Sequence, residues 1–188
     1  MACIDRNRTQ LALHSLSVMA LALGFAPGAG AQPPQPIRLA VFAFELEDAS
    51  AVRTFASEAP DEAAVAGALE DASSEARREL VESGRYALVD VSRVDAAPVK
   101  EQSLRKCDGC EAGIAAQLGA DQSLLGVVLK ASQTDYYVVI QIRDARTGRL
   151  VDQQGANFAG TEAGWASGVR MLIKHQVLAG EDAPRSPP

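Results

Sequence analysis

Histidine, cysteine and aromatic residues are scarce in this chain of 188 residues, which has 2 histidines, 3 cysteines and 5% aromatic residues. So few histidines argue against Ser-His-Asp catalysis and against a zinc site built on several imidazoles. The sequence also lacks a nucleophile elbow and a glycine-rich phosphate loop after a strand. These absences favour a protein that is not an enzyme and that binds no cofactor and no metal.

Positive charge and long apolar runs are scarce as well. The chain has 18 Lys and Arg residues against 24 Asp and Glu residues, with a formal net charge of −6. An acidic chain without a basic cluster argues against nucleic acid and against an anionic membrane surface as partners. The amino-terminal apolar run, Leu11–Phe25, is interrupted by His14 and is shorter than the roughly 20 residues of a membrane-spanning helix.

Residues 1–31 are typical of a secretory signal peptide. Arg6 and Arg8 precede the apolar run, and Ala29-Gly30-Ala31 follows it with the small-x-small pattern of a cleavage site. We expect the mature chain to begin at Gln32 and to be exported to the periplasm. No membrane span is then expected after cleavage.

The mature chain predicts one α/β domain. We expect a proline-rich leader over 32–36, a single domain over 37–178 and a disordered tail over 179–188. The hydrophobic patterns predict a mixed five-stranded sheet with helices packed on it, in the order β-α-β-α-β-β-β-α. The expected elements are strands 37–45, 85–91, 122–131, 136–143 and 150–158, and helices 61–83, 111–118 and one that starts at 161.

Three strand relationships are also predicted. A right-handed crossover would place the first two strands parallel. The last strand is the most polar and is expected at an edge of the sheet. Asp144-Ala145-Arg146-Thr147-Gly148 predicts a hairpin turn before it, with Gly148 in a left-handed conformation. Trp165 is expected in the core.

Cys107 and Cys110 form a C-x-x-C motif at the start of the second helix. Residues three apart on a helix have Cα atoms about 5–6 Å apart, which permits a disulfide. In an oxidising compartment these two cysteines are expected to pair. The helix start lowers a thiol pKa, so a redox-active pair is an alternative. Half of a zinc site is a third interpretation, but further ligands are missing from the sequence.

Glu45, Glu47 and Asp48 follow the first predicted strand. If the second and third strands flank the first, its carboxyl end is a topological switch point, where open α/β sheets bind ligands. Three carboxylates there would suit a cation or another small ligand. The ordinary alternative is a solvated turn.

Several segments together resemble a family of secreted bacterial proteins known only as a domain of unknown function. They are I-R-L-A-V-F-x-F-E-L-E-D, K-C-D-G-C-E followed by A-x-x-L-G-A-D, R-D-A-x-T-G-R-L-V and Trp165. The resemblance covers roughly residues 37–178, and Ala43 departs from it where an acidic residue is expected. The element order is also similar to the amino-terminal domain of TolB and to CsgG-like envelope proteins. The family resemblance implies an accessory role beside periplasmic quinoprotein oxidation systems.

We therefore expect a non-catalytic periplasmic module that binds a protein partner in the cell envelope. One alternative is a thiol–disulfide redox protein that uses Cys107 and Cys110. A second alternative is a cation or small-ligand binder at Glu45, Glu47 and Asp48.

Overall fold

The structure, a computed structural model, describes residues 35–49, 61–93, 103–132 and 134–180. The expected signal peptide lies outside the described residues, as do most of the expected leader and tail. In the described ranges, no helix combines the length and apolarity that crossing a bilayer requires.

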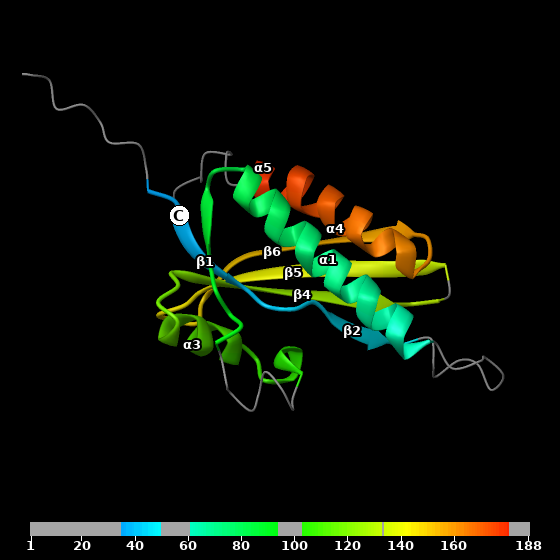
Figure 1. Cartoon of the computed structure of the whole chain (residues 1–188), viewed down its shortest axis with the longest axis horizontal. Helices are drawn as coiled ribbons and strands as arrows, with labels where there is room; N and C mark the ends of the chain where they lie inside the picture. The colour runs from blue at the N-terminus through cyan, green and yellow to red at the C-terminus, as the bar shows by residue number, and fades with distance from the viewer. Residues whose placement is uncertain (1–34, 50–60, 94–102, 133, 181–188) are drawn as a thin grey trace, which may run out of the picture. The chain divides into compact units, whose positions relative to one another are not determined.

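A mixed sheet of six strands forms the centre of the fold (Figure 1). The first three strands run parallel to their neighbours, and the last three form an antiparallel meander. The α/β class is therefore confirmed, and the second and third predicted strands do flank the first. In spatial order the strands are β3 (Tyr86–Val89), β1 (Ile37–Val41), β4 (Gln122–Lys130), β5 (Asp135–Asp144) and β6 (Leu150–Ala159), with β2 (Glu45–Asp48) also paired to β4.

The prediction of five strands is wrong because the first strand is interrupted between β1 and β2. The backbone N–H of Phe44 is donated to the Ser73 hydroxyl of helix α1 (Glu62–Glu82), at 2.9 Å. The Phe44 ring lies on Gly126 of β4, where a built Cβ would be only 2.2 Å from the ring. A contact with a distant helix therefore breaks the strand, and the apolar run around Phe44 carries no sign of it.

Helix α1 begins and ends at residues that the sequence marks. The Asp61 carboxylate accepts the backbone N–H of Ala63 at 3.0 Å, which satisfies one of the free amides of the first turn. Gly84 follows the helix with a φ of 71°, a left-handed conformation that favours glycine. The predicted apolar stripe faces the core, with Ala72, Ala76 and Leu80 buried and Val65 and Leu69 packed at its margin.

The carboxyl-terminal helices cover the same face of the sheet as α1 (Figure 1). A 3-10 turn, Glu162–Gly164, leads into α4 (Trp165–Leu172), a π-helical segment (Ile173–Val177) and α5 (Leu178–Gly180). Trp165 is 1% exposed, so its predicted core position is confirmed. The Tyr136 hydroxyl donates to the Gly164 carbonyl at 2.9 Å, which joins β5 to this segment.

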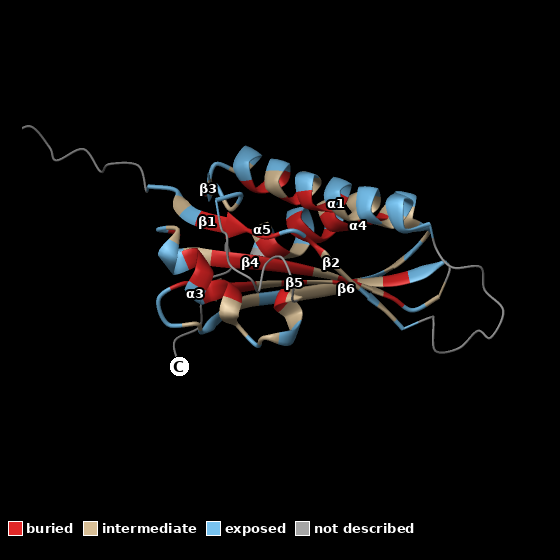
Figure 2. Cartoon of the chain, turned by 60° about the horizontal axis from the view of Figure 1, so that its bottom comes forward, coloured by how far each residue is buried: buried red, intermediate tan, exposed pale blue. Residues whose placement is uncertain are grey.

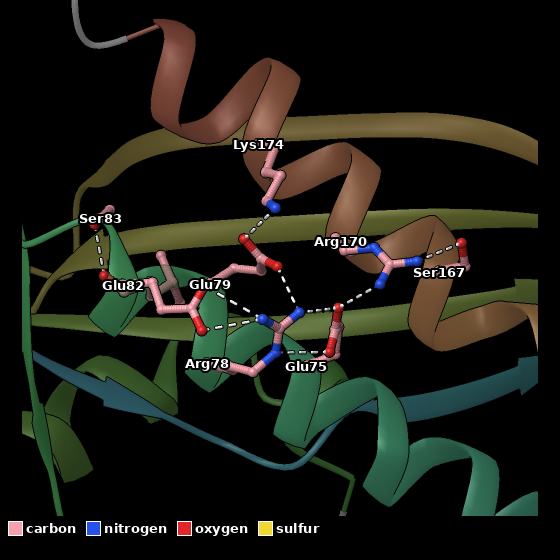
Figure 3. A network of polar contacts seen from close by, with 9 residues as sticks. Glu75, Arg78, Glu79, Glu82, Ser83, Ser167, Arg170 and Lys174 are labelled. Carbon is pink, nitrogen blue, oxygen red and sulfur yellow. Dashed lines mark hydrogen bonds and ion pairs between the residues drawn. The ribbon is translucent and has the colours of Figure 1, made fainter.

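A charged network holds α1 against the carboxyl-terminal helices (Figure 3). Glu79 is 2% exposed, and its carboxylate lies 2.7 Å from Arg78 Nη2 and 3.2 Å from Lys174 Nζ. Glu75 contacts Arg78 at 2.6 Å and Arg170 at 3.3 Å. Both carboxylates have cationic partners on two helices, so the network fastens the helical layer.

A smaller layer covers part of the opposite face. It consists of the 3-10 helix η2 (Leu104–Lys106) and helix α3 (Cys110–Gln117). Figure 2 shows α1 and α4 on one side of the sheet and α3 on the other, toward one end of it. The apolar cluster under this layer includes Ala40, Phe42, Leu104, Ile114, Ala115 and Leu125.

Candidate functional site

The Cys107–Cys110 disulfide lies where α3 begins, and its Cα atoms are 5.6 Å apart. The intervening Asp108 and Gly109 have φ values of 44° and 101°. The chain therefore turns through two left-handed residues before the helix, and glycine suits the second of them. The predicted pairing of the two cysteines is confirmed.

Glu111, the residue after the motif, is 2% exposed. Its Oε1 atom lies 3.1 Å from Arg143 Nε of β5. Its Oε2 atom is buried and has no hydrogen-bond partner among the described residues. Arg143 also donates to the Gly148 carbonyl at 3.1 Å and lies 3.6 Å from the Asp108 carboxylate. A buried ion pair thus lies directly beside the disulfide.

Cys107, Cys110 and Glu111 each offer one ligand atom, and these atoms all lie within 4.8 Å of one another. Both cysteines are only partly buried, whereas Glu111 is buried. Sequence reasoning missed Glu111 and Arg143. The position of Glu111 next to Cys110 was the one sequence signal for this pair. The local sequence does not show that Arg143 of β5 would contact Glu111.

The predicted carboxylate site is differently arranged. Glu45 lies in β2. Its carboxylate accepts hydrogen bonds from the Ser103 hydroxyl, just before η2, and from the backbone N–H of Leu104, the first residue of η2. Arg105 lies 3.4 Å from Glu45 and 3.6 Å from Glu47. Glu45 thus fixes the start of η2, and Glu47 shares its cation.

Asp48 lies apart from the other two carboxylates. Side chains alternate along a strand, so Asp48 is on the face of β2 opposite Glu45 and Glu47. The Lys130 hydrogen bond lowers the pKa of Glu162, and the Asp48 charge opposes that shift, which places Asp48 near this pair. The structure therefore brings two of the three predicted residues together at Arg105. Cation binding at β2 stays a prediction.

The long edge strand β6 forms a second candidate binding surface. It is the last strand in the sheet, and no second described strand pairs with it. Leu150 and Val151 at its start are 44% and 39% exposed. The predicted edge position is thereby confirmed. The Gly148 turn before it has the predicted left-handed glycine, with a φ of 71°.

The sheet face beyond α3 is only partly buried. Val127 pairs with Val139 and Leu129 with Tyr137 in the antiparallel register, so these four side chains share that face. All four are of intermediate exposure. The Tyr137 hydroxyl lies over Gly155 of β6, where a built Cβ would be 2.2 Å away. This apolar strip leads directly to the free edge.

Comparison with known proteins gives a matching family. Residues 37–177 match the family DUF3280, described as "Protein of unknown function (DUF2380)". No curated protein matches the chain. Lipoprotein GNA1162 from Neisseria meningitidis is 15% identical with a TM-score of 0.47, and the match covers 79% of this chain and 100% of that one.

Two further solved structures have a similar fold. The LpoB C-terminal domain from Escherichia coli is 18% identical with a TM-score of 0.45, over 69% of this chain and 88% of that one. TolB from Acinetobacter baumannii is 15% identical with a TM-score of 0.41, over 79% of this chain and 29% of that one. The predicted resemblance to a family of unknown function is confirmed by the family match, and at these identities the solved structures carry no conclusion about function.

Proposed function

We propose that the chain, which belongs to the DUF3280 family, is a non-catalytic interaction module of the cell envelope that binds a protein partner through strand β6. The observation that carries the proposal is the free outer edge of β6, a strand of ten residues. An exposed edge presents unpaired N–H and C=O groups that an extended segment of another chain can pair with.

The composition of β6 supports this use of the edge. Edge strands that avoid partners are short or carry lysine, proline or several charges. The other terminal strand of the sheet, β3, has only four residues. In contrast, β6 (LVDQQGANFA) has ten residues, a single charge at Asp152 and no proline. It is therefore the strand least protected against pairing with another chain.

The apolar strip of Val127, Leu129, Tyr137 and Val139 adds side-chain contacts to this edge. Strand addition gains affinity from main-chain hydrogen bonds and specificity from pockets for alternate side chains. Half-buried aliphatic and tyrosine side chains on one face next to the edge suit a partner segment with apolar residues at every second position.

The envelope location in this proposal rests on residues 1–31, whose pattern predicts export. The family resemblance further suggests a component of a periplasmic quinoprotein oxidation system as the partner. Intact mass of the protein recovered from the periplasm tests the first point, since retention of residues 1–31 on that protein would contradict export.

Site-specific photo-crosslinking tests the edge directly. Gln153 is an exposed residue of β6, and Gln117 is an exposed residue at the end of α3 that serves as a matched control. A photoreactive amino acid at position 153 should give one discrete adduct in intact cells, while the same group at position 117 should give none. Mass spectrometry of the adduct identifies the partner and shows whether it belongs to a quinoprotein system.

A charge substitution supplies the second arm. Gln153→Lys should weaken formation of the adduct from a probe at Asn157, because a lysine on the edge disfavours strand addition. Gln117→Lys makes the same chemical change and should leave the adduct unchanged. Equal yields from positions 153 and 117, or no adduct from either, would contradict the proposal.

A further inference from the structure

We propose that reduction of the Cys107–Cys110 disulfide creates a binding site for one divalent cation of the zinc class, with Glu111 as the third protein ligand. This inference concerns the α3 end of the sheet and does not depend on the proposed partner at β6. It extends the prediction from sequence, in which the cysteine pair lacked any further ligand.

The geometry of the three ligand atoms fits one cation. They lie within 4.8 Å of one another. Zinc binds thiolate sulfur at about 2.3 Å and carboxylate oxygen at about 2.0–2.2 Å, so two atoms bound to one tetrahedral ion are separated by roughly 3.5–3.8 Å. Once the S–S bond is broken, small side-chain rotations therefore bring all three to one ion. The C-x-x-C spacing is also the usual spacing of paired zinc cysteines.

Glu111 provides the independent observation that points to a ligand. Buried carboxylate oxygens almost always have hydrogen-bond partners. Here the Oε2 atom is buried without one among the described residues, although the residue is 2% exposed. Arg143 forms an ion pair with the other oxygen, with Nε 3.1 Å from Oε1, although this Nε atom has no hydrogen-bond partner among the described residues. An outer contact of this kind orients a metal-binding carboxylate and leaves its second oxygen free for the ion.

The surroundings allow both a reductant and an ion to reach the site. Cys107 and Cys110 are partly exposed, while the carboxylate lies beneath them. In the cation-bound reduced state, two thiolates and Glu111 together carry three negative charges. A divalent cation and the Arg143 guanidinium offset them. A solvent molecule takes the fourth position of a tetrahedral ion.

The redox step requires a dithiol or phosphine reductant. With a dithiol, one thiolate attacks a cysteine sulfur and forms a mixed disulfide, which breaks the Cys107–Cys110 bond. The second thiolate of the reductant then releases that cysteine, and the reductant leaves as a cyclic disulfide. Two electrons pass to the protein, and both cysteines take up a proton. The incoming cation displaces these two protons into solvent.

Cobalt titration of the purified mature protein tests the proposal. After reduction with a phosphine and anaerobic removal of the reductant, one Co²⁺ per chain should bind with a thiolate-to-cobalt charge-transfer band. Zinc should displace it and abolish the band. The oxidised protein should show no band. Absence of the band in the reduced protein would overturn the proposal.

Substitutions separate the carboxylate from the cysteines. Changes to outer groups already cost about 10- to 100-fold in metal affinity, so Glu111→Gln should weaken cobalt binding at least tenfold. Glu79→Gln removes an equally buried carboxylate from the α1 network and should leave the affinity unchanged. Unchanged affinity in Glu111→Gln, or an equal loss in Glu79→Gln, would exclude Glu111 as a ligand.

Folding of the variants is checked by far-ultraviolet circular dichroism. If Glu111→Gln does not fold, Cys110→Ser takes its place, because the reduced unmutated chain already lacks the disulfide. This variant should keep the spectrum of the reduced protein and lose the charge-transfer band. A full-strength band in folded Cys110→Ser would contradict the site.

Discussion

Replacing Gly126 with alanine tests the contact that separates β1 from β2. Gly126 lies in the middle of β4, where a built Cβ would be 2.2 Å from Cε1 and 2.3 Å from Cζ of Phe44. Phe44 is 3% exposed, and its backbone N–H is bound to Ser73 at 2.9 Å. The ring therefore has neither free space nor a mobile backbone with which to avoid the new methyl group.

The expected cost follows from overpacking a rigid core. Forcing an extra methyl group into such a site destabilises a protein by about 1–3 kcal/mol. In a domain of this size, 1 kcal/mol shifts the melting temperature by about 2–4 °C, so Gly126→Ala should lower it by roughly 2–12 °C. Urea unfolding of the mature, oxidised protein should show a lower midpoint with an unchanged slope.

Two further variants make this test specific. Gly67 lies in α1 with no atom within 4 Å of a built Cβ, so Gly67→Ala should stabilise the protein by about 0.5–1 kcal/mol. Phe44→Leu should recover part of the Gly126→Ala loss, with a coupling of at least about 0.5 kcal/mol. The reasoning is refuted if Gly126→Ala is as stable as the unmutated protein, or if its cost is the same with leucine at position 44.

Three further predictions concern charges and the disulfide. Glu45→Ala leaves a backbone N–H of η2 without its acceptor and should lower the free energy of unfolding by about 1–3 kcal/mol. Glu47→Ala, at a side chain 53% exposed, should change it by no more than about 0.5 kcal/mol. Thermal melts check both values, and a calcium-dependent rise in the melting temperature of the unmutated protein would instead support a cation site at β2. Reduction of the Cys107–Cys110 disulfide should lower the free energy of unfolding by only about 2 kcal/mol, because the closed loop is short. A glutathione titration should place the reduction potential of the disulfide below roughly −300 mV, whereas a value near −120 to −180 mV would indicate a redox protein. The Arg78 hydrogen bond lowers the pKa of Glu75 below its ordinary 4.5. The stability from this pair is therefore complete above about pH 4.5 and is lost as the pH falls through the lower pKa of the folded protein. Unfolding measured across this pH range should show a smaller loss of stability in acid for Glu75→Gln than for the unmutated protein, and an equal loss would contradict the pairing.

Elements with strong local patterns could be predicted from the sequence. Helix α1 combines an Asp61 cap, an apolar stripe and a terminal Gly84, and each of these acts within the helix itself. The β5–β6 hairpin is equally local, because alternating side chains and the Gly148 turn fix its register. These signals agree with one another, so the predicted positions are close to those observed.

Features that depend on distant contacts could not be predicted. The break after β1 arises from Ser73 in α1 and Gly126 in β4, neither of which is close to Phe44 in sequence. The same limit applies to the candidate site. Glu111 looks like an ordinary first-turn acid of a helix, and only the packing of β5 beneath it buries the carboxylate and supplies Arg143.

Arg143 links the disulfide to the start of the free edge strand. It lies at the register shift between β5 and β6, donates to the Gly148 carbonyl at 3.1 Å and pairs with Glu111 at 3.1 Å. A change in the Glu111 carboxylate would therefore reach the hairpin turn through one side chain. The far end of β6 is held differently, because Phe158 stacks on Tyr136 beneath α4, with ring centroids 5.6 Å apart. We therefore expect any influence of the cysteine pair on partner binding to act at the Leu150 end of the edge, where Arg143 contacts the hairpin turn.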